Sequence, residues 1–413
     1  MRTRARIVIL AVALAVAAQS APIPAQQAPI GWSEYVHHIV RLLEEHSVLR
    51  YEIDWTAFRV RVDAIMAPYN LEIEAERYEV LRQVFALLRN HCDVHSSYCP
   101  LGTLEEERAA WADGRIPHAP GEGLANPYGI DARMLDGGIG YVSIPRTFPD
   151  PLLGVPEAAP GMGLELLRLV RLLDAKQPAG WVIDLRGDRG GCLWTRWIGF
   201  HPFLAPGCLF GNAVPVPDSP PKLTRWTSFR DGLFTEVSVD SEGVQSESMT
   251  ADLGSDRYTL SNPAAPIAVL IGETTASAGE YTALALRQNP RVRVFGQASL
   301  GATTAIDGFE LEDGSLLLVA TQYMVDPLGH VFASATRAPW ATGSRLSTGN
   351  CVAEPLRPDV LIPLQKPLSA AAQDRMTPDQ ILAYLGADPV LDAALAWLRE
   401  TQTSSSVDAV TTP

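Results

Sequence analysis

Hydrophobic positions along the chain follow two different periods, and these separate a helical part from a part built on buried strands. Between residues 30 and 90, apolar residues recur every three or four positions. Two such stripes stand out: Val36, Ile39, Val40 and Leu43, then Val80, Leu81, Val84, Phe85 and Leu88. This spacing is typical of amphipathic helices, so we predict a small helical domain over residues 28–111.

Later in the chain the apolar runs are short, continuous and rich in β-branched residues, as at Trp181–Leu185 and Ile267–Ile271. Such runs are typical of parallel strands that are buried on both faces. An amphipathic stretch over 164–173 precedes the first of them and predicts a β-α-β unit. We therefore expect an α/β fold over residues 130–400, with a mostly parallel twisted sheet and flanking helices.

Polar, alternating segments interrupt this pattern over residues 213–263, where Asp231-Gly232 is a turn signal. They predict a β-hairpin insertion into the α/β core. Residues 112–129 are rich in proline and glycine and predict a linker. The Thr/Ser-rich end, residues 401–413, predicts a disordered tail.

The first 27 residues have the pattern of an export signal. Arg2, Arg4 and Arg6 precede the apolar stretch Ile7–Ala18, and the triplet Ala15–Ala17 or Val16–Ala18 suits a cleavage site. This stretch is shorter than the roughly 20 residues of a membrane span. We expect a cleaved signal peptide over residues 1–27 and a periplasmic or secreted protein with no membrane span.

Charge narrows the range of partners. The chain has 47 acidic and 33 basic residues, a formal net charge of −14, and no basic run. Nucleic-acid binding needs clustered lysine and arginine, so we expect no nucleic-acid partner. Hydrophobic residues make up 47% and charged residues 19%, as in a soluble globular protein.

Ser277 is the first candidate for chemistry. It lies in a turn of small residues between the predicted strand Ile267–Ile271 and an Ala/Leu-rich helical pattern. A helix N-terminus has unpaired N–H groups and partial positive charge, which would stabilise an oxyanion beside this serine. The alternative is that Ser277 only caps the helix. The strand Trp181–Leu185 also ends in a polar, glycine-rich loop, Arg186–Gly191, and the two strand ends can face each other.

These segments, together with Gly140–Ile144, Val292–Gln297 and Arg357–Val360, resemble the S41 serine peptidases, which include the C-terminal processing and tricorn-type enzymes. The resemblance covers about residues 130–363, in order and spacing. It implies a ClpP/crotonase-like core and Ser277 as nucleophile. It also implies oxyanion-hole N–H groups from Gly190 or Gly191 and from Ala278.

The residue that would serve as base differs from the lysine of the better-known branch of that family, which uses a Ser-Lys dyad. Ala302 stands where that lysine is expected, and the chain has only three lysines, Lys176, Lys222 and Lys366. Cys92–Ser96 instead resembles the Asp-x-His-Ser motif of the tricorn-like branch, which implies His95 as general base. The resemblance implies Glu354 as the group that orients His95, with Asp93 and Ser96 as alternatives. The segment between His95 and Tyr141 is too short for the PDZ domain of the Ser-Lys branch.

Export makes the five cysteines informative, because disulfides persist in oxidising compartments. We expect Cys92 to pair with Cys99 and Cys192 with Cys208, which leaves Cys351 over. The alternative is that all five are reduced and buried.

Three functions fit these residues. The first is a secreted serine endopeptidase that acts on peptides or unfolded chains and needs no cofactor or metal. The second is a non-catalytic S41-like protein that binds hydrophobic ligands or peptides, as relatives resembling interphotoreceptor retinoid-binding protein do. The third takes His91 and His95 as metal ligands on one helical face, although Cys92 stands where a zincin has glutamate.

Overall fold

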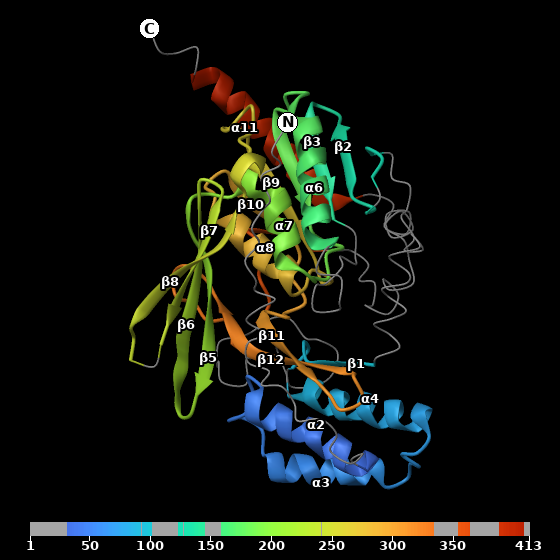
Figure 1. Ribbon diagram of the computed structural model, residues 1–413. Helices are drawn as coiled ribbons and strands as arrows, with labels where there is room; N and C mark the ends of the chain where they lie inside the picture. The colour runs from blue at the N-terminus through green and yellow to red at the C-terminus, as the bar shows by residue number, and fades with distance from the viewer. Residues whose placement is uncertain are drawn as a thin grey trace, which may run out of the picture.

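The molecule combines a helical end with two β-sheets (Figure 1). The computed structural model describes residues 31–91, 93–100, 123–126, 128–144, 158–240, 242–333, 354–363 and 388–408. Figure 1 shows the helices of residues 32–90 at one end and the parallel sheet with its helices at the other, with strands β1 (Ser97–Cys99), β11 (Thr304–Glu310) and β12 (Leu316–Val325) between them.

The three N-terminal helices are α2 (Trp32–His46), α3 (Trp55–Met66) and α4 (Glu74–Asn90). Both apolar stripes seen in the sequence are buried, which confirms the helices and their faces. They pack in one core with Leu317, Val319 and Tyr323. The helical end is therefore attached to a sheet rather than folded separately.

The six-stranded sheet has the order β13-β10-β9-β4-β3-β2, and all neighbours are parallel except the antiparallel β2–β3 pair. Its strands are β2 (Asp131–Leu135), β3 (Ile139–Ser143), β4 (Gly180–Asp184), β9 (Ile267–Ile271), β10 (Val292–Gly296) and β13 (Val360–Leu361). Strands β4 and β9 are buried throughout, as their continuous apolar runs predict. The expected α/β fold with a mostly parallel sheet is thus confirmed.

Helices cover both faces of this sheet. Successive side chains of a strand point to opposite faces. Ile183 and Val269 lie in one core with α6 (Ala158–Asp174), α7 (Leu193–Phe200) and α8 (Ala278–Arg287). Val182 and Ala268 lie in another core with α11 (Pro389–Asp408). The C-terminal helix therefore closes the face opposite α8.

The second sheet has seven strands and is antiparallel, in the order β1-β12-β5-β6-β7-β8, with β11 also paired to β12. Its strands are β1 (Ser97–Cys99), β5 (Gly207–Val216), β6 (Ser219–Arg230), β7 (Leu233–Val239), β8 (Gln245–Asp252), β11 (Thr304–Glu310) and β12 (Leu316–Val325). The insertion predicted over 213–263 is thus larger than a hairpin: four strands, β5–β8, begin at Gly207 and end at Asp252. Short turns η2 (His201–Phe203) and η3 (Gly254–Asp256) flank them.

Helix α11 corrects one sequence expectation. It runs to Asp408, so residues 401–408 are helical rather than disordered. The Thr401 hydroxyl donates to the Trp397 carbonyl at 2.9 Å, which lets a threonine continue the helix without an unpaired polar group. The signal segment 1–27, residues 112–122 of the linker and residues 409–413 lie outside the described residues. Among the helices that are described, none has the length and apolar character needed to cross a membrane.

Candidate active site

Ser277 lies between β9 and α8, where the sequence predicts it. Its backbone has φ +52° and ψ −121°, a conformation that residues other than glycine rarely adopt. Strained residues of this kind concentrate at functional sites and persist only when their surroundings hold them. The Ser277 N–H donates to Glu280 Oε2 at 2.8 Å, so part of that support comes from the first turn of α8.

The glycine-rich loop after β4 lies directly against Ser277. A Cβ atom added to Gly190 would lie 2.6 Å from Ser277 Cβ and 3.1 Å from the Ala278 nitrogen. Gly190 and Gly191 have φ +99° and +108°, which glycine adopts without strain. The two strand ends therefore meet as the sequence suggested, with no room for a side chain between them.

The backbone N–H groups around Ser277 differ in availability. The Gly190 N–H already donates to Asp188 Oδ1 at 2.9 Å. In the part of the chain that the structure describes, the N–H groups of Gly191 and Ala278 donate to no protein acceptor. Of the three predicted oxyanion-hole residues, Gly191 and Ala278 thus have N–H groups to offer, and Gly190 supplies the close approach.

A buried ion pair that the sequence analysis missed supports this loop. Arg196 on α7 and Asp188 are both fully buried and paired, with Arg196 Nε 2.7 Å from Asp188 Oδ2. Arg196 also donates to the carbonyls of Gly190 and Cys192, and the Asp188 carbonyl accepts from the Ala276 N–H at 3.0 Å. Because the pair joins α7, the glycine loop and the serine turn, it fixes how these three segments meet.

His95 lies just beyond α4, in a turn held by Asp93 and Ser96. Asp93 Oδ1 accepts from the N–H groups of His95 and Ser96 at 3.0 and 2.8 Å, and Asp93 Oδ2 accepts from the Ser96 hydroxyl at 2.6 Å. The Ala320 N–H donates to Ser96 Oγ at 2.9 Å, which ties the turn to β12. Asp93 and Ser96 therefore position the His95 backbone and leave its ring to another partner.

That partner is Thr304 on β11, whose Oγ1 lies 2.7 Å from His95 Nδ1. Burial lowers the pKa of His95 to about 4, so the ring is neutral at physiological pH. No sequence signal marked Thr304, because the pairing of β11 and β1 with β12 brings it to His95 across 209 residues.

Glu354 lies close to His95 but has another partner. Both residues line a cavity of about 20 Å³, which has room for little more than one water molecule. Glu354 Oε1, however, lies 2.7 Å from His330 Nε2. Thr304 contacts the His95 ring and Glu354 pairs with His330, so the role of Glu354 in orienting His95 stays a prediction.

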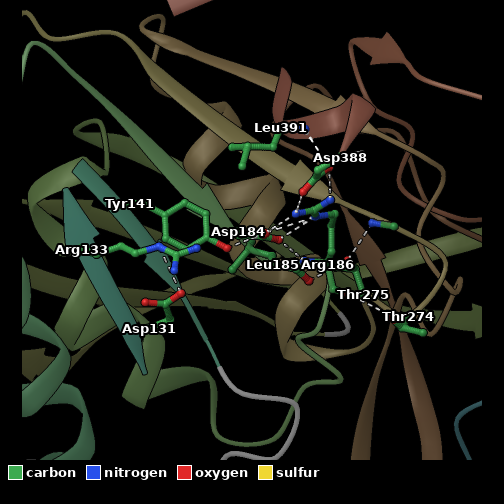
Figure 2. Close-up of polar contacts among 11 residues, drawn as sticks. Asp131, Arg133, Tyr141, Asp184, Leu185, Arg186, Thr274, Thr275, Asp388 and Leu391 are labelled. Carbon is green, nitrogen blue, oxygen red and sulfur yellow. Dashed lines mark hydrogen bonds and ion pairs between the residues drawn. The ribbon is translucent and has the colours of Figure 1, made fainter. Parts of the chain in front are cut away.

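Figure 2 shows a second polar network on the strand that leads into the glycine loop. The Tyr141 hydroxyl donates to Asp184 Oδ2 at 2.9 Å, and Arg186 binds Asp184 as well as both carboxylate oxygens of Asp388, each at 2.7 Å. Asp388 Oδ1 also accepts from the Leu391 N–H in the first turn of α11. The C-terminal helix is thus fastened to the segment that carries Gly190.

The cysteines differ from their predicted pairing. Cys208 is a free thiol that donates to the Phe210 carbonyl, and burial raises its pKa to about 11. The Cys192–Cys208 disulfide is therefore absent. Cys92 and Cys351 lie outside the described residues, so the Cys92–Cys99 pair stays a prediction.

The alternative metal site requires His91 and His95 to lie on one face of a helix. Helix α4 ends at Asn90, so His91 and His95 do not share a helical face. In the described ranges, no group of three histidine, cysteine or acidic side chains is arranged to hold a metal ion.

Comparison with known proteins agrees with this geometry. Residues 138–336 match the model of peptidase family S41. Nisin-resistance protein of Lactococcus lactis subsp. lactis is 29% identical over 164 residues, which are 39% of this chain and 45% of that protein. The matched segment thus spans less than half of this curated relative.

Two solved structures share the fold. A lipoprotein from Streptococcus agalactiae aligns with TM-score 0.52 and 18% identity, over 86% of this chain and 100% of that chain. A proposed peptidase from Parabacteroides merdae aligns with TM-score 0.52 and 14% identity, over 90% and 97% of the two chains. The family model is matched across the strands that carry the glycine loop and Ser277, and residues 138–336 thus belong to peptidase family S41.

Proposed function

We propose that this protein hydrolyses peptide bonds with Ser277 as nucleophile and His95 as general base. The observation that carries the proposal is the contact between Gly190 and Ser277. In this contact, a serine of strained backbone lies at a helix N-terminus, beside N–H groups that have no protein acceptor among the described residues. An acyl oxygen that becomes negative beside Ser277 Oγ would receive hydrogen bonds from Gly191 and Ala278.

His95 supports the proton transfer through its tautomer. The tautomer that this mechanism requires has Nδ1–H donating to Thr304 Oγ1, which would leave the lone pair of the neutral ring on Nε2. Nε2 would take the Ser277 proton as the oxygen attacks the peptide carbonyl, and would return it to the leaving amine. Water would then release the acyl group by the same steps, with His95 again as base.

The substrates we propose are peptides or unfolded chains, and the location is periplasmic or extracellular. The pattern of residues 1–27 supports export, and the fold shared with a Streptococcus agalactiae lipoprotein agrees with it. Nisin, which names the Lactococcus relative, belongs among the peptides to test.

A mass-spectrometric digest tests the proposal. The purified protein, Ser277→Ala and His95→Ala are each incubated with a peptide library, unfolded casein and nisin. We expect cleavage by the wild type that both variants lose. Cleavage that persists in Ser277→Ala would show that the nucleophile is wrong. A wild type that cleaves nothing between pH 6 and 9 would favour the non-catalytic binding protein.

A further inference from the structure

Glu280 is a buried carboxyl group that the proposed mechanism does not use. It lies on the first turn of α8 with none of its surface exposed. Its hydrogen-bond donors among the described residues are neutral: the Ser277 N–H reaches Oε2 at 2.8 Å, and the Gly301 N–H and the Ser299 hydroxyl reach Oε1. An unexposed carboxyl group is costly, so its retention between two segments calls for an explanation.

The two carboxyl oxygens serve the two halves of the site. Oε2 holds the backbone of Ser277, whose positive φ needs support. Oε1 holds the loop 299–304, which ends at Thr304, the residue that contacts His95. The Leu300 N–H donates to the Thr275 carbonyl at 2.9 Å, a second link between this loop and the serine turn.

The same loop continues the connection to a third segment. Ser299 Oγ accepts from the Leu356 N–H at 2.8 Å, and the Ser299 N–H donates to the Leu356 carbonyl at 3.0 Å. Glu354, two residues earlier, lines the His95 cavity together with Gly301 and Thr304. Glu280 thus lies where the nucleophile turn, the loop beside the base and the segment near Glu354 converge.

We propose that Glu280 is a positioning residue that holds Ser277 and the loop carrying Thr304 in register, so that Ser277 and His95 can exchange a proton. This inference rests on the proposed function. The ionised carboxylate suits the role because the N–H groups of Ser277 and Gly301 can only donate. A protonated carboxyl could direct its hydrogen only to Ser299 Oγ. Its oxygens would accept the hydrogen bonds from the two N–H groups more weakly than a carboxylate does.

Burial raises the pKa of Glu280 to about 7, so its charge changes in the range where the enzyme would work. Burial raises the pKa of Tyr281 and the charge of Glu280 adds to the rise, so Tyr281 is neutral in this range. His95 stays neutral above its pKa of about 4. Two charged pairs lie on the segments packed nearby, Asp188 with Arg196 and Glu354 with His330. Arg189, Glu273 and Arg357 on these segments are exposed.

Glu280→Gln reproduces the neutral side chain at every pH, which makes it the key variant. The matched control is Glu273→Gln, an exposed glutamate on the same turn that contacts none of these groups. For a peptide that the wild type cleaves, kcat and KM are measured from pH 5 to 9, and circular dichroism checks the fold of each variant.

We expect the wild-type and Glu273→Gln kcat to rise through about pH 7. Glu280→Gln should have a kcat lower by about 10- to 100-fold with KM within about twofold, and no rise near pH 7, because a misplaced nucleophile loses rate rather than binding. Ser299→Ala removes a donor to Oε1 and keeps the carboxyl group, so its kcat should fall less, and it should keep the rise.

A folded Glu280→Gln protein with wild-type kcat and wild-type pH profile would overturn the inference and leave the proposed function intact. If Glu280→Gln does not fold, Ser299→Ala decides: a lowered kcat supports the inference, and a wild-type kcat there would overturn it, because the hydroxyl contact between Glu280 and the loop would then have no part in catalysis. Cleavage that survives in Ser277→Ala is a different failure, since it removes the proposed nucleophile and the inference with it.

Discussion

Gly190 and Ser277 touch so closely that any side chain at position 190 would collide with the nucleophile, since an added Cβ would lie 2.6 Å from Ser277 Cβ. Gly190→Ala should therefore displace the serine turn or the glycine loop and lower kcat by about 100-fold, similar to the loss of an oxyanion-hole donor. The control is Gly187→Ala in the same loop, where an added Cβ lies no nearer than 3.8 Å to its neighbours. Equal kcat values for the two variants would contradict this account of the site.

Thr304 should act on catalysis through the orientation of the His95 ring. Thr304→Val keeps the shape of the side chain and removes the hydroxyl 2.7 Å from His95 Nδ1. We expect kcat to fall about 10- to 100-fold because the productive tautomer is no longer favoured. Thr304→Ser, which retains the hydroxyl, should recover most of the activity. Similar losses in both variants would mean that packing, and not the hydrogen bond, matters at this position.

Arg196 should matter for stability as well as activity. Arg196→Met leaves the Asp188 carboxylate buried without its cation, which typically costs about 3–5 kcal/mol. Thermal or denaturant unfolding measures the loss. The exposed pair Arg168–Glu165 is the comparison, since Arg168→Met should change the free energy of unfolding by less than about 1 kcal/mol. A loss in Arg196→Met no larger than in Arg168→Met would contradict the buried-pair interpretation.

The raised pKa of Glu280 predicts how the stability of the folded protein depends on pH. Because its pKa is raised from 4.5 to about 7, the folded protein holds this proton more tightly than the unfolded chain does. Its contribution to stability is fully present below about pH 4.5 and is lost as the pH rises through about 7. The free energy of unfolding of Glu280→Gln relative to the wild type should therefore increase from pH 5 to 8. A difference that stays constant over this range would show that Glu280 is ionised throughout.

The sequence predicted those parts of the molecule that local patterns determine. Continuous apolar runs marked β4 and β9, helical stripes marked α2 and α4, and the small-residue turn placed Ser277 before α8. The glycine-rich loop was expected to face Ser277 because both follow parallel strands, whose carboxyl ends share one edge of the sheet, and the S41 resemblance implied Gly190 or Gly191 within that loop.

Long-range side-chain pairing could not be predicted in this way. Thr304 reaches His95 only because β11 and β1 both pair with β12. An arginine in a helix is usually expected at the surface, yet Arg196 is buried on α7 and contacts Asp188. The Cys192–Cys208 prediction failed because an oxidising compartment does not determine how far apart two cysteines lie in the fold.

The most direct measurement is covalent labelling with a fluorophosphonate, followed by mass-spectrometric identification of the modified residue. Such reagents react with a serine hydroxyl that a neighbouring base activates. We predict modification of Ser277 alone in the wild type, a rate lower by at least about 100-fold in His95→Ala, and no modification in Ser277→Ala. Labelling of another serine, or an unchanged rate in His95→Ala, would contradict the assignment of Ser277 and His95.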